Sequence, residues 1–434
     1  MPNSTAMPAS RPRVVVAMSG GVDSSVAAAV LVEQGFDCVG VFMRHATPAL
    51  PAAGMLPIVE PPRPGHQGCC SAVDALDARR VADRLGIPLY ALDLTPEFVE
   101  IIDSFAAEYG RGRTPNPCVR CNSQLKFGRL FDHADAIGAS FIATGHYARI
   151  DRDAGGAPVL CRGLDAARDQ SYVLFDVSPG RLERMLLPVG GMPKAEVRAR
   201  AAALGLVTAD KPDSQEICFV APGDHARLVA ARLGGSRAGE FVDASGRVLG
   251  RHAGVEHFTV GQRRGLGLAT GTPLFVVRIE AESCRVVVGP REEVPEEELM
   301  AAEATWLVPV PTEPFECHVQ CRAQRSAAPA VVTPLSVHRF HARFTGGPAA
   351  SPGAISPGQP AVIYDGDRLL GGGWIAGSGA DGPRPSGTRV QEAISSARVQ
   401  RPSPAPGASP LACEAGPCSP GPKTGKFPPA SVAN

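Results

Sequence analysis

Residues 14–25 read Val-Val-Val-Ala-Met-Ser-Gly-Gly-Val-Asp-Ser-Ser, and this stretch decides the fold that the sequence predicts. The apolar run 14–18 predicts a short buried strand, and residues 24–33 predict a helix that ends at Gly35. A glycine-rich turn between a strand and a helix lets backbone N–H groups approach phosphate oxygens, and the helix N-terminus adds partial positive charge. The turn is not the common P-loop, because no Gly-Lys-Ser/Thr follows it.

Asp23 places a carboxylate within this turn. A carboxylate beside phosphates makes chemical sense if Mg²⁺ bridges Asp23 to a pyrophosphate. The simpler alternative is a glycine-rich turn in which an Asp or Ser side chain only caps the helix. The complete seven-residue string 19–25, set between a strand and a helix, favours phosphate binding.

Strand and helix patterns alternate through the first half of the chain. Further strands are predicted at 38–43, 89–92 and 141–144, further helices at 72–85, 96–109 and 122–137, and a loop at 48–68. Strands separated by helices predict an α/β fold with a parallel, doubly wound sheet. Ligands of such a sheet bind at the carboxyl ends of its strands.

The pattern changes after about residue 225. A hairpin is predicted from 274–280 and 285–289, and short β-like runs follow at 316–320, 337–344, 361–365 and 368–375. These runs indicate one or two small β domains. Residues 377–434 contain 11 prolines and 8 glycines in 58 residues and show no hydrophobic periodicity, so we expect this tail to be disordered.

Composition limits the class of protein. The 434 residues carry 43 Lys+Arg and 43 Asp+Glu, which excludes a uniformly basic nucleic-acid coat but not a local basic face. Twelve cysteines are too few for a disulfide scaffold, residues 1–13 lack the apolar segment of an export signal, and no apolar run is long enough to span a membrane. We therefore expect a cytoplasmic protein whose cysteines are buried, metal-binding or catalytic.

Two strings contain candidate reactive cysteines. Residues 114–122 read Thr-Pro-Asn-Pro-Cys-Val-Arg-Cys-Asn, a two-proline turn that we expect to deliver Cys121 just before a helix. A cysteine at a helix N-terminus, flanked by Arg113 and Arg120, should ionise readily and be nucleophilic. Residues 211–219, Lys-Pro-Asp-Ser-Gln-Glu-Ile-Cys-Phe, present Cys218 after another proline-containing turn.

The string 19–25 resembles the pyrophosphate loop of the ATP-pyrophosphatase superfamily, whose members split ATP into AMP and pyrophosphate to adenylate a substrate. Other strings narrow the resemblance, namely 114–122, Ala-Thr-Gly-His-Tyr at 143–147, Arg-Asp-Gln-Ser-Tyr at 168–172, 211–219, Gly-Gln-Arg-Arg-Gly at 261–265 and Leu-Gly-Gly-Gly-Trp-Ile at 370–375. Together they resemble the bacterial tRNA-specific 2-thiouridylase family from residue 13 to about residue 376.

The resemblance implies a domain plan and a reaction. It implies an ATP-pyrophosphatase catalytic domain of the adenine nucleotide alpha hydrolase-like type at 13–225, a small central tRNA-binding domain at 226–298 and a C-terminal β-barrel at 299–376, between a disordered N-terminus (1–12) and the tail (377–434). ATP would adenylate the C2 oxygen of the wobble uridine, position 34, and a persulfide on Cys218 would supply sulfur. Cys121 would be the partner nucleophile, and a reductant would reopen the resulting disulfide.

Matching positions imply the remaining roles. The phosphates and adenine would be bound by Ala17, Met18, Ser19, Gly20, Gly21, Val22, Asp23, Ser24, Met43 and Gly145. The tRNA would be contacted by Asn116, Pro117, Cys118, His146, Arg168, Asp169, Gln170, Arg343, Phe344 and Gln359. Three of these depart from the family pattern, because Asp, Lys and Tyr are usual where this chain has Cys118, Arg168 and Phe344.

The remaining cysteines leave alternatives open. Cys118, Cys121 and Cys218 could ligate an iron–sulfur cluster, or Cys118 could only tune or protect Cys121. Cys69 and Cys70 lie at a helix start and are more simply structural. We expect five further cysteines to be buried and unreactive, namely Cys38, Cys161, Cys284, Cys317 and Cys321.

The expected partners are tRNAs of the Lys, Glu and Gln type and a sulfur donor, either a cysteine desulfurase or a relay protein. Residues 317–343 contain four Arg and three His and no acid, which suits RNA phosphates, although charge alone would equally describe a solvated basic face. Two rivals stay open: a GMP-synthetase-like amidotransferase, and a non-catalytic tRNA-binding or sulfur-carrier protein.

Overall fold

The computed structural model describes residues 11–44, 71–213, 217–220, 224–347 and 350–378. Its first domain is built on a five-stranded sheet with the order β3-β2-β1-β4-β7 and parallel pairing throughout. The strands are β1 (Arg13–Ala17), β2 (Asp37–Arg44), β3 (Leu89–Asp93), β4 (Phe141–Ala143) and β7 (Met185–Leu186). The apolar run that the sequence marks as a strand lies at the centre, because its valines are completely buried.

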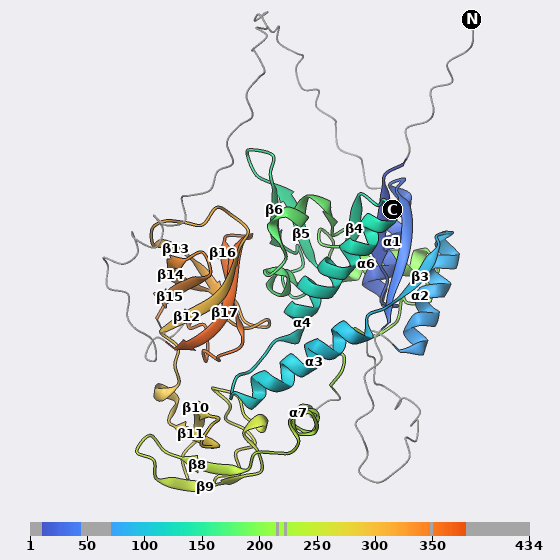
Figure 1. Ribbon diagram of the computed structural model, residues 1–434. Coiled ribbons are helices and arrows are strands. Elements are labelled where there is room, and N and C mark those ends of the chain that lie inside the picture. Colours follow the sequence, from blue (N-terminus) through green and yellow to red (C-terminus); the bar gives the residue numbers. More distant parts are fainter. Residues whose placement is uncertain (1–10, 45–70, 214–216, 221–223, 348–349, 379–434) are drawn as a thin grey trace, which may run out of the picture.

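Helices connect these strands and cover the sheet. They are α1 (Val22–Glu33), α2 (Ala72–Leu85), α3 (Thr95–Gly110), α4 (Pro117–Arg120), the π-helical η1 (Cys121–Arg129), α5 (Leu130–Ala136) and α6 (Lys194–Ala203), with 3₁₀ turns η2 (Ser171–Leu174) and η3 (Pro179–Arg184). The predicted doubly wound α/β sheet is therefore confirmed. α3 runs away from the sheet toward the central domain, where it packs on α7 (His225–Leu233) (Figure 1).

One predicted boundary is wrong in a way that matters. The sequence places a helix at 122–137, but helical structure begins at Pro117, with Asn116 as its N-cap and the Asn116 side-chain oxygen accepting from the Cys118 N–H at 3.2 Å. Proline is well suited to the first helical position because its missing N–H would be unpaired there in any case. Cys121 consequently lies one turn inside the helical segment, at the start of the wider π-helical turn, and not before a helix.

The central domain contains a four-stranded sheet with the order β10-β11-β8-β9. Its strands are β8 (Gly239–Val242), β9 (Val248–His252), β10 (Phe275–Glu280) and β11 (Arg285–Gly289), with short turns η4 (Val255–His257) and η5 (Arg291–Glu293). The predicted hairpin is present, because β10 and β11 pair antiparallel. A small apolar cluster that includes Phe241, Phe258 and Val276 forms the core of this domain.

The C-terminal domain is a closed barrel of six antiparallel strands. They are β12 (Glu298–Trp306), β13 (Phe315–Gln320), β14 (Ala328–Ser336), β15 (Arg339–Phe344), β16 (Pro360–Asp365) and β17 (Arg368–Ser378), and pairing between β12 and β17 closes the ring. Closure removes the exposed sheet edges that would otherwise be open to aggregation.

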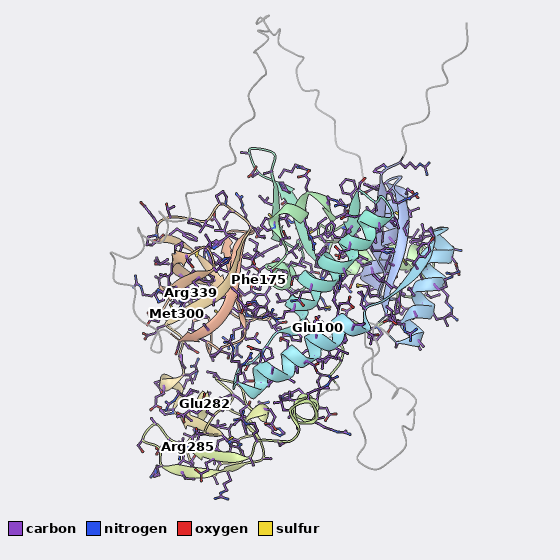
Figure 2. The ribbon with its side chains drawn as sticks, viewed as in Figure 1. Glu100, Phe175, Glu282, Arg285, Met300 and Arg339 are labelled. Atoms are coloured by element: carbon purple, nitrogen blue, oxygen red, sulfur yellow. The ribbon has the colours of Figure 1, made fainter. Side chains whose placement is uncertain are left out.

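A hairpin of the first domain is attached to this barrel. β5 (Ala148–Arg152) and β6 (Pro158–Arg162) pair with each other, and β6 meets β17 at Cys161 and Arg368. One large apolar cluster continues across the junction, where the Phe175 ring lies 5.9 Å from the Trp374 ring. Figure 2 shows Phe175 between the barrel and the helices of the first domain. The two domains therefore share a core.

Several expectations fall outside the described residues. These are the disordered N-terminus apart from residues 11–12, the whole of the loop at 48–68, Cys69 and Cys70, and the tail from residue 379. Among the helices that the structure describes, none is long and apolar enough to cross a membrane.

Candidate active site

The turn between β1 and α1 presents the N-terminus of α1 to a cavity. Gly21 is the N-cap residue of α1, and no side chain caps this helix end, so the alternative of a simple Asp or Ser cap does not hold. Instead the Ser24 hydroxyl accepts from the Ser19 N–H at 3.2 Å and donates to the Gly21 carbonyl at 3.2 Å, which fixes the turn from within. The first-turn N–H groups are thus left for an anion.

Gly145 brings a second backbone segment against this turn. It follows β4, and a Cβ atom added there would lie 2.6 Å from the backbone carbon of Asp23 and 2.6 Å from the backbone nitrogen of Ser24. Only a residue without a side chain permits this approach. Gly145 therefore packs directly against the turn of residues 19–25, the phosphate loop, and its expected role in binding ATP stays a prediction.

Two side chains hold the Asp23 carboxylate. The Tyr147 hydroxyl donates to Asp23 Oδ1 at 2.7 Å, and Lys194 Nζ lies 2.7 Å from Oδ1 and 2.9 Å from Oδ2. Burial and the neighbouring Asp23 carboxylate raise the pKa of Tyr147, so its hydroxyl keeps its proton and remains a donor. Asp23 also lines the cavity, and a carboxylate is one of the oxygen ligands that Mg²⁺ accepts in proteins.

Lys211 holds the turn between β1 and α1 in place through Gly20 and connects it to α2. Its Nζ donates to the Gly20 carbonyl at 2.9 Å and to Asp74 and Asp77 of α2 at 2.6 and 2.7 Å. Burial alone would lower the pKa of Lys211, but the two carboxylates outweigh burial and raise it. The string 211–219 is thereby tied directly to the phosphate loop at its first residue.

These groups line a cavity of about 280 Å³ at the carboxyl ends of β1, β2 and β4. Of the residues expected to bind ATP, the cavity is lined by Ala17, Ser19, Gly21, Val22, Asp23, Ser24, Met43 and Gly145. Met18 and Gly20 are not among its lining residues. Met18 is buried in the core, and Gly20 has φ of +74°, with its backbone held by Lys211.

A second cavity of about 730 Å³ is lined by the three cysteines of the strings 114–122 and 211–219. Cys118, Cys121 and Cys218 all line it, although Cys218 is distant from the others in sequence. The two cavities meet, because both are lined by Cys121, Lys126, His146 and Gln170. Cys121 therefore lines both the first cavity and the second, and Cys218 lines the second.

The turn that carries Cys121 is held against the barrel. The Thr114 N–H donates to the Pro357 carbonyl at 2.8 Å, and the Gln359 side-chain amide donates to the Thr114 carbonyl at 2.8 Å. The Arg120 guanidinium lies 4.8 Å from the centre of the Trp374 ring. The barrel thus braces residues 114–121, and Gln359 lies at this brace while also lining the second cavity.

His146 is buried between the two cavities. Its Nδ1 lies 2.8 Å from the Thr144 hydroxyl, and burial lowers its pKa well below the ordinary value of histidine. The nearby Lys126 acts in the same direction. His146 is accordingly neutral at pH 7, which suits a hydrogen-bonding role better than that of a charged phosphate contact.

Residues 168–172 make consecutive contacts with different parts of the molecule. Arg168 pairs with Asp213 at 2.9 Å, and Gln170 Oε1 accepts from the Tyr147 N–H at 2.9 Å. The Asp169 carboxylate accepts from Arg162 at 2.7 Å and also from Gly163 and Ser171. Arg168 and Gln170 line the first cavity, and Asp169 and Gln170 line the second, where the Asp169 oxygens already accept hydrogen bonds from the protein.

The three cysteines of the second cavity do not form a metal site as they lie. Within the described ranges, no group of three or more His, Cys, Asp or Glu side chains is arranged to hold a metal ion. Cys118 is exposed, while Cys121 and Cys218 are partly buried against an apolar cluster. The residues present therefore do not fit the iron–sulfur cluster that the sequence left open.

The cysteines expected to be unreactive are mostly buried. Burial raises the pKa of Cys38 and Cys161 to about 11 and that of Cys317 and Cys321 to about 12. Such thiols stay protonated at neutral pH and are poor nucleophiles. Cys284 differs, because it is only partly buried, on the edge of the central domain.

Arg343 and Phe344 lie on β15 of the barrel, outside both cavities. Arg339 and Arg343 are exposed, but Phe344 packs against the barrel core. Of the other arginines in the acid-free stretch, Arg322 is partly buried and donates to the Val260 carbonyl and the Ser356 hydroxyl. Part of that basic stretch therefore joins the barrel to the central domain.

Sequence reasoning missed the importance of Lys194 and Tyr147. Tyr147 belongs to a quoted string, but nothing in its spacing indicates contact with Asp23. Lys194 follows Pro193 at the start of α6, a position that indicates a helix start and no more. Only the fold brings these side chains to the phosphate loop.

Comparison with known proteins agrees with this geometry. Three family models match in order: a tRNA methyl transferase HUP domain at residues 12–222, a tRNA methyl transferase PRC-barrel domain at 228–290 and an aminomethyltransferase beta-barrel domain at 296–375. The chain is 46% identical to the tRNA-specific 2-thiouridylase MnmA of Rhodopirellula baltica, over 84% of this chain and 96% of that protein. It is also 46% identical to that of Geobacter metallireducens, over 86% and 99%.

A further relative from Acidothermus cellulolyticus, with the same description, is 47% identical over 84% of this chain and 97% of that protein. The match extends through all three domains, and it covers nearly the whole of each relative. The chain therefore belongs to the tRNA-specific 2-thiouridylase MnmA family.

Proposed function

We propose that this protein is a sulfurtransferase that converts the wobble uridine of tRNA, position 34, to 2-thiouridine at the expense of ATP. The observation that carries the proposal is the meeting of two cavities at Cys121, one lined by the phosphate loop and the other by Cys218. Adenylation and sulfur transfer need adjacent sites, because the activated uracil must face a sulfur nucleophile before water reaches it.

The phosphate loop supports adenylation. The N-terminus of α1, the hydroxyl of Ser19 and the close approach of Gly145 would hold the phosphates of ATP, while the Ser24 hydroxyl keeps the turn in shape. Asp23 would supply the carboxylate ligand of a magnesium ion, which would neutralise phosphate charge when bound. Met43, at the end of β2, lines the same cavity and would contact the adenine ring.

The paired cysteines support sulfur transfer over other adenylation chemistry. The C2 oxygen of uracil would bond to the α-phosphorus, and pyrophosphate would leave with the electron pair. The terminal sulfur of a Cys218 persulfide would then attack C2 and expel AMP. Cys121 would attack the Cys218 sulfur, which leaves sulfur on the base and a Cys121–Cys218 disulfide that an external dithiol must reduce.

Contacts with tRNA follow from the second cavity and the barrel. Asn116, Pro117, Cys118, His146 and Gln170 line the cavity that would receive the target base, with Arg168 beside the nucleotide. Arg343 would bind RNA phosphate on the barrel face. Gln359 would act at the brace of residues 114–121, and Asp169 would act through Arg162, since its oxygens are already engaged.

A nucleoside assay tests the proposal. The protein, unmodified tRNA for Lys, Glu or Gln, ATP, Mg²⁺ and a cysteine desulfurase with cysteine are incubated, and the digested nucleosides are analysed by mass spectrometry. Wild type should form 2-thiouridine, whereas Cys121→Ser and Cys218→Ser should form none and should still bind ATP. Cys284→Ser is the matched control and should retain activity, because Cys284 lines neither cavity. Full activity of either cavity variant would overturn the assignment.

A further inference from the structure

Cys118 is the third thiol of the second cavity, and the proposed sulfur transfer does not use its sulfur. Cys118, Cys121 and Cys218 all line this cavity, but they differ in exposure. Cys118 is exposed, whereas Cys121 and Cys218 are partly buried against the apolar cluster that includes Phe98 and Phe219. The disulfide that sulfur transfer would produce therefore joins the two less exposed sulfurs.

The local structure places Cys118 and Cys121 on one helical face. α4 begins at Pro117, and the helical backbone continues through Arg120 and Cys121. Residues three apart on a helix have Cβ atoms about 5–6 Å apart, and disulfides form at about 4 Å. A small adjustment of this turn would let the two sulfurs bond, as they do in the CxxC motifs of thiol–disulfide oxidoreductases.

The turn that carries the two thiols is held on both sides. Before Cys118, the Asn116 side-chain oxygen accepts from the Cys118 N–H at 3.2 Å, and Gln359 of the barrel donates to the Thr114 carbonyl at 2.8 Å. After Cys121, the Asn122 side-chain amide donates to the Val173 carbonyl at 3.0 Å. The backbone therefore keeps Cys118 one helical turn from Cys121.

A Cys121–Cys218 disulfide must be reopened before the protein can act again. The rate of thiol–disulfide exchange depends on which sulfur is attacked and on how accessible that sulfur is. A reductant that is itself a folded protein reaches an exposed sulfur more readily than one packed against an apolar cluster. Of the three sulfurs in this cavity, exposure favours that of Cys118.

We infer that Cys118 is a resolving thiol, which moves the disulfide from the partly buried pair to the exposed end of the cavity. After losing its proton, the Cys118 sulfur attacks the Cys121 sulfur, so a Cys118–Cys121 bond forms and the Cys121–Cys218 bond breaks. The electron pair leaves with Cys218, which takes up a proton and can accept sulfur again. The inference rests on the proposed function.

A protein dithiol completes the cycle. Its first thiolate attacks the exposed Cys118 sulfur and releases Cys121, and its second thiol then attacks the first and releases Cys118. The dithiol is oxidised by two electrons, and all three cysteines of the cavity return to the thiol form. The partner that this surface fits is therefore a reductant of the thioredoxin class, which acts on Cys118.

A trapping experiment on the wild-type protein identifies the attacked sulfur. The protein is loaded with sulfur by a cysteine desulfurase and cysteine, separated from both, and given tRNA and ATP for one turnover without reductant. Thioredoxin whose second active-site cysteine is replaced by serine is then added, because it attacks once and stays attached to the sulfur that it meets. After digestion, mass spectrometry should find the conjugate on Cys118.

Two variants test the effect on turnover, namely Cys118→Ser and Cys118→Asp, the second of which carries the residue that is usual in the family. Because Cys118 also lines the cavity expected to receive the target base, the rate of the first turnover is measured for each variant. With thioredoxin as reductant, the ratio of later turnovers to the first should fall by about tenfold or more, since the exposed route of reduction is gone.

Two controls separate this effect from general damage. Cys284→Ser removes a partly buried thiol that lines neither cavity, and it should change neither the trapped position nor the ratio. Dithiothreitol is small enough to enter a cavity of about 730 Å³. It should therefore bring the ratio for Cys118→Ser to within about threefold of wild type, because it can attack the partly buried disulfide directly.

The outcomes are distinguishable. A wild-type conjugate on Cys121 or Cys218 would overturn the inference, and so would a ratio for Cys118→Ser within about threefold of wild type with thioredoxin. If wild type forms no 2-thiouridine in its first turnover, the proposed function fails before any reductant is added. If wild type forms 2-thiouridine and the conjugate lies elsewhere, the resolving role alone is refuted.

Discussion

The Gly145→Ala substitution tests the close approach on which the nucleotide site depends. The added methyl carbon would lie 2.6 Å from the backbone of Asp23 and Ser24. This is about 0.9 Å short of the roughly 3.5 Å at which such atoms ordinarily touch. Both neighbours are backbone atoms of the first turn of α1, so neither can rotate away as a side chain would. The phosphate loop and the strand end that carries Gly145 must therefore separate.

The magnitude follows from that displacement. Overpacking of this kind costs about 1–3 kcal/mol of unfolding free energy, so the variant should fold but melt at a lower temperature. A misplacement of about 1 Å at the phosphate loop should reduce the rate of adenylation by about 10²-fold. Catalysis should thus fall much more than stability does.

The assay compares single-turnover pyrophosphate release and thermal unfolding in wild type and in the variant. Gly180→Ala is the matched control, because a Cβ atom at Gly180 meets nothing within 4 Å. It should leave the rate unchanged. If Gly145→Ala retained a rate within about threefold of wild type, the phosphate loop would not need this approach, and the placement of ATP at α1 would be refuted.

Three other predictions concern stability, pH and RNA. Lys211→Met should cost about 3–5 kcal/mol in urea unfolding, because it leaves the buried Asp74 carboxylate without a cation, while Asp77 keeps Arg80 at 3.6 Å. A cost below about 1 kcal/mol would contradict the ion-pair geometry. Burial lowers the pKa of His146 below its value in the unfolded chain, so the unfolded chain is protonated first as the pH falls. The free energy of unfolding should therefore decrease below about pH 6.5. His146→Gln should reduce this decrease when urea unfolding is compared at about pH 7.5 and about pH 5.5. Arg343→Ala should decrease the slope of log K against log salt for tRNA binding by about one, whereas Arg152→Ala, which breaks an exposed pair with a glutamate of η3, should not change it.

The sequence anticipated the first domain well because its signals are local. The apolar run before the Ser-Gly-Gly turn, the capping residues of α2 and the glycine that ends α2 all act within a few residues of where they lie. The capping box of Ser71 and Asp74 explains why the predicted bounds of α2, 72–85, coincide with the observed ones. Local signals of this kind need no knowledge of the fold.

The errors arose where a distant segment decides the local structure. The helix at Pro117 begins earlier than predicted, because the preceding residues are fixed by the barrel through Thr114 and Gln359. The β5–β6 hairpin was not predicted, and it depends on β17, which lies far along the chain. The hydrogen bonds that the Asp169 carboxylate accepts from Arg162, Gly163 and Ser171 were not predicted either, and Arg162 also donates to Gln320 of the barrel.

The sequence by itself determined the position of the phosphate loop, the order of the domains and the positions of the two candidate cysteines. Each of these is indicated by residues that are contiguous in the chain, so no long-range contact is needed to predict it. Only the tertiary structure decided that Cys121 lies between two cavities, that Cys218 lines one of them, and that Lys194 shares Asp23 with Tyr147. The physical reason is that these contacts join residues from separate strands and helices. Their distances are set by how the parallel sheet, the hairpin and the barrel pack together. Hydrophobic periodicity along the chain predicts helices and strands but not this packing.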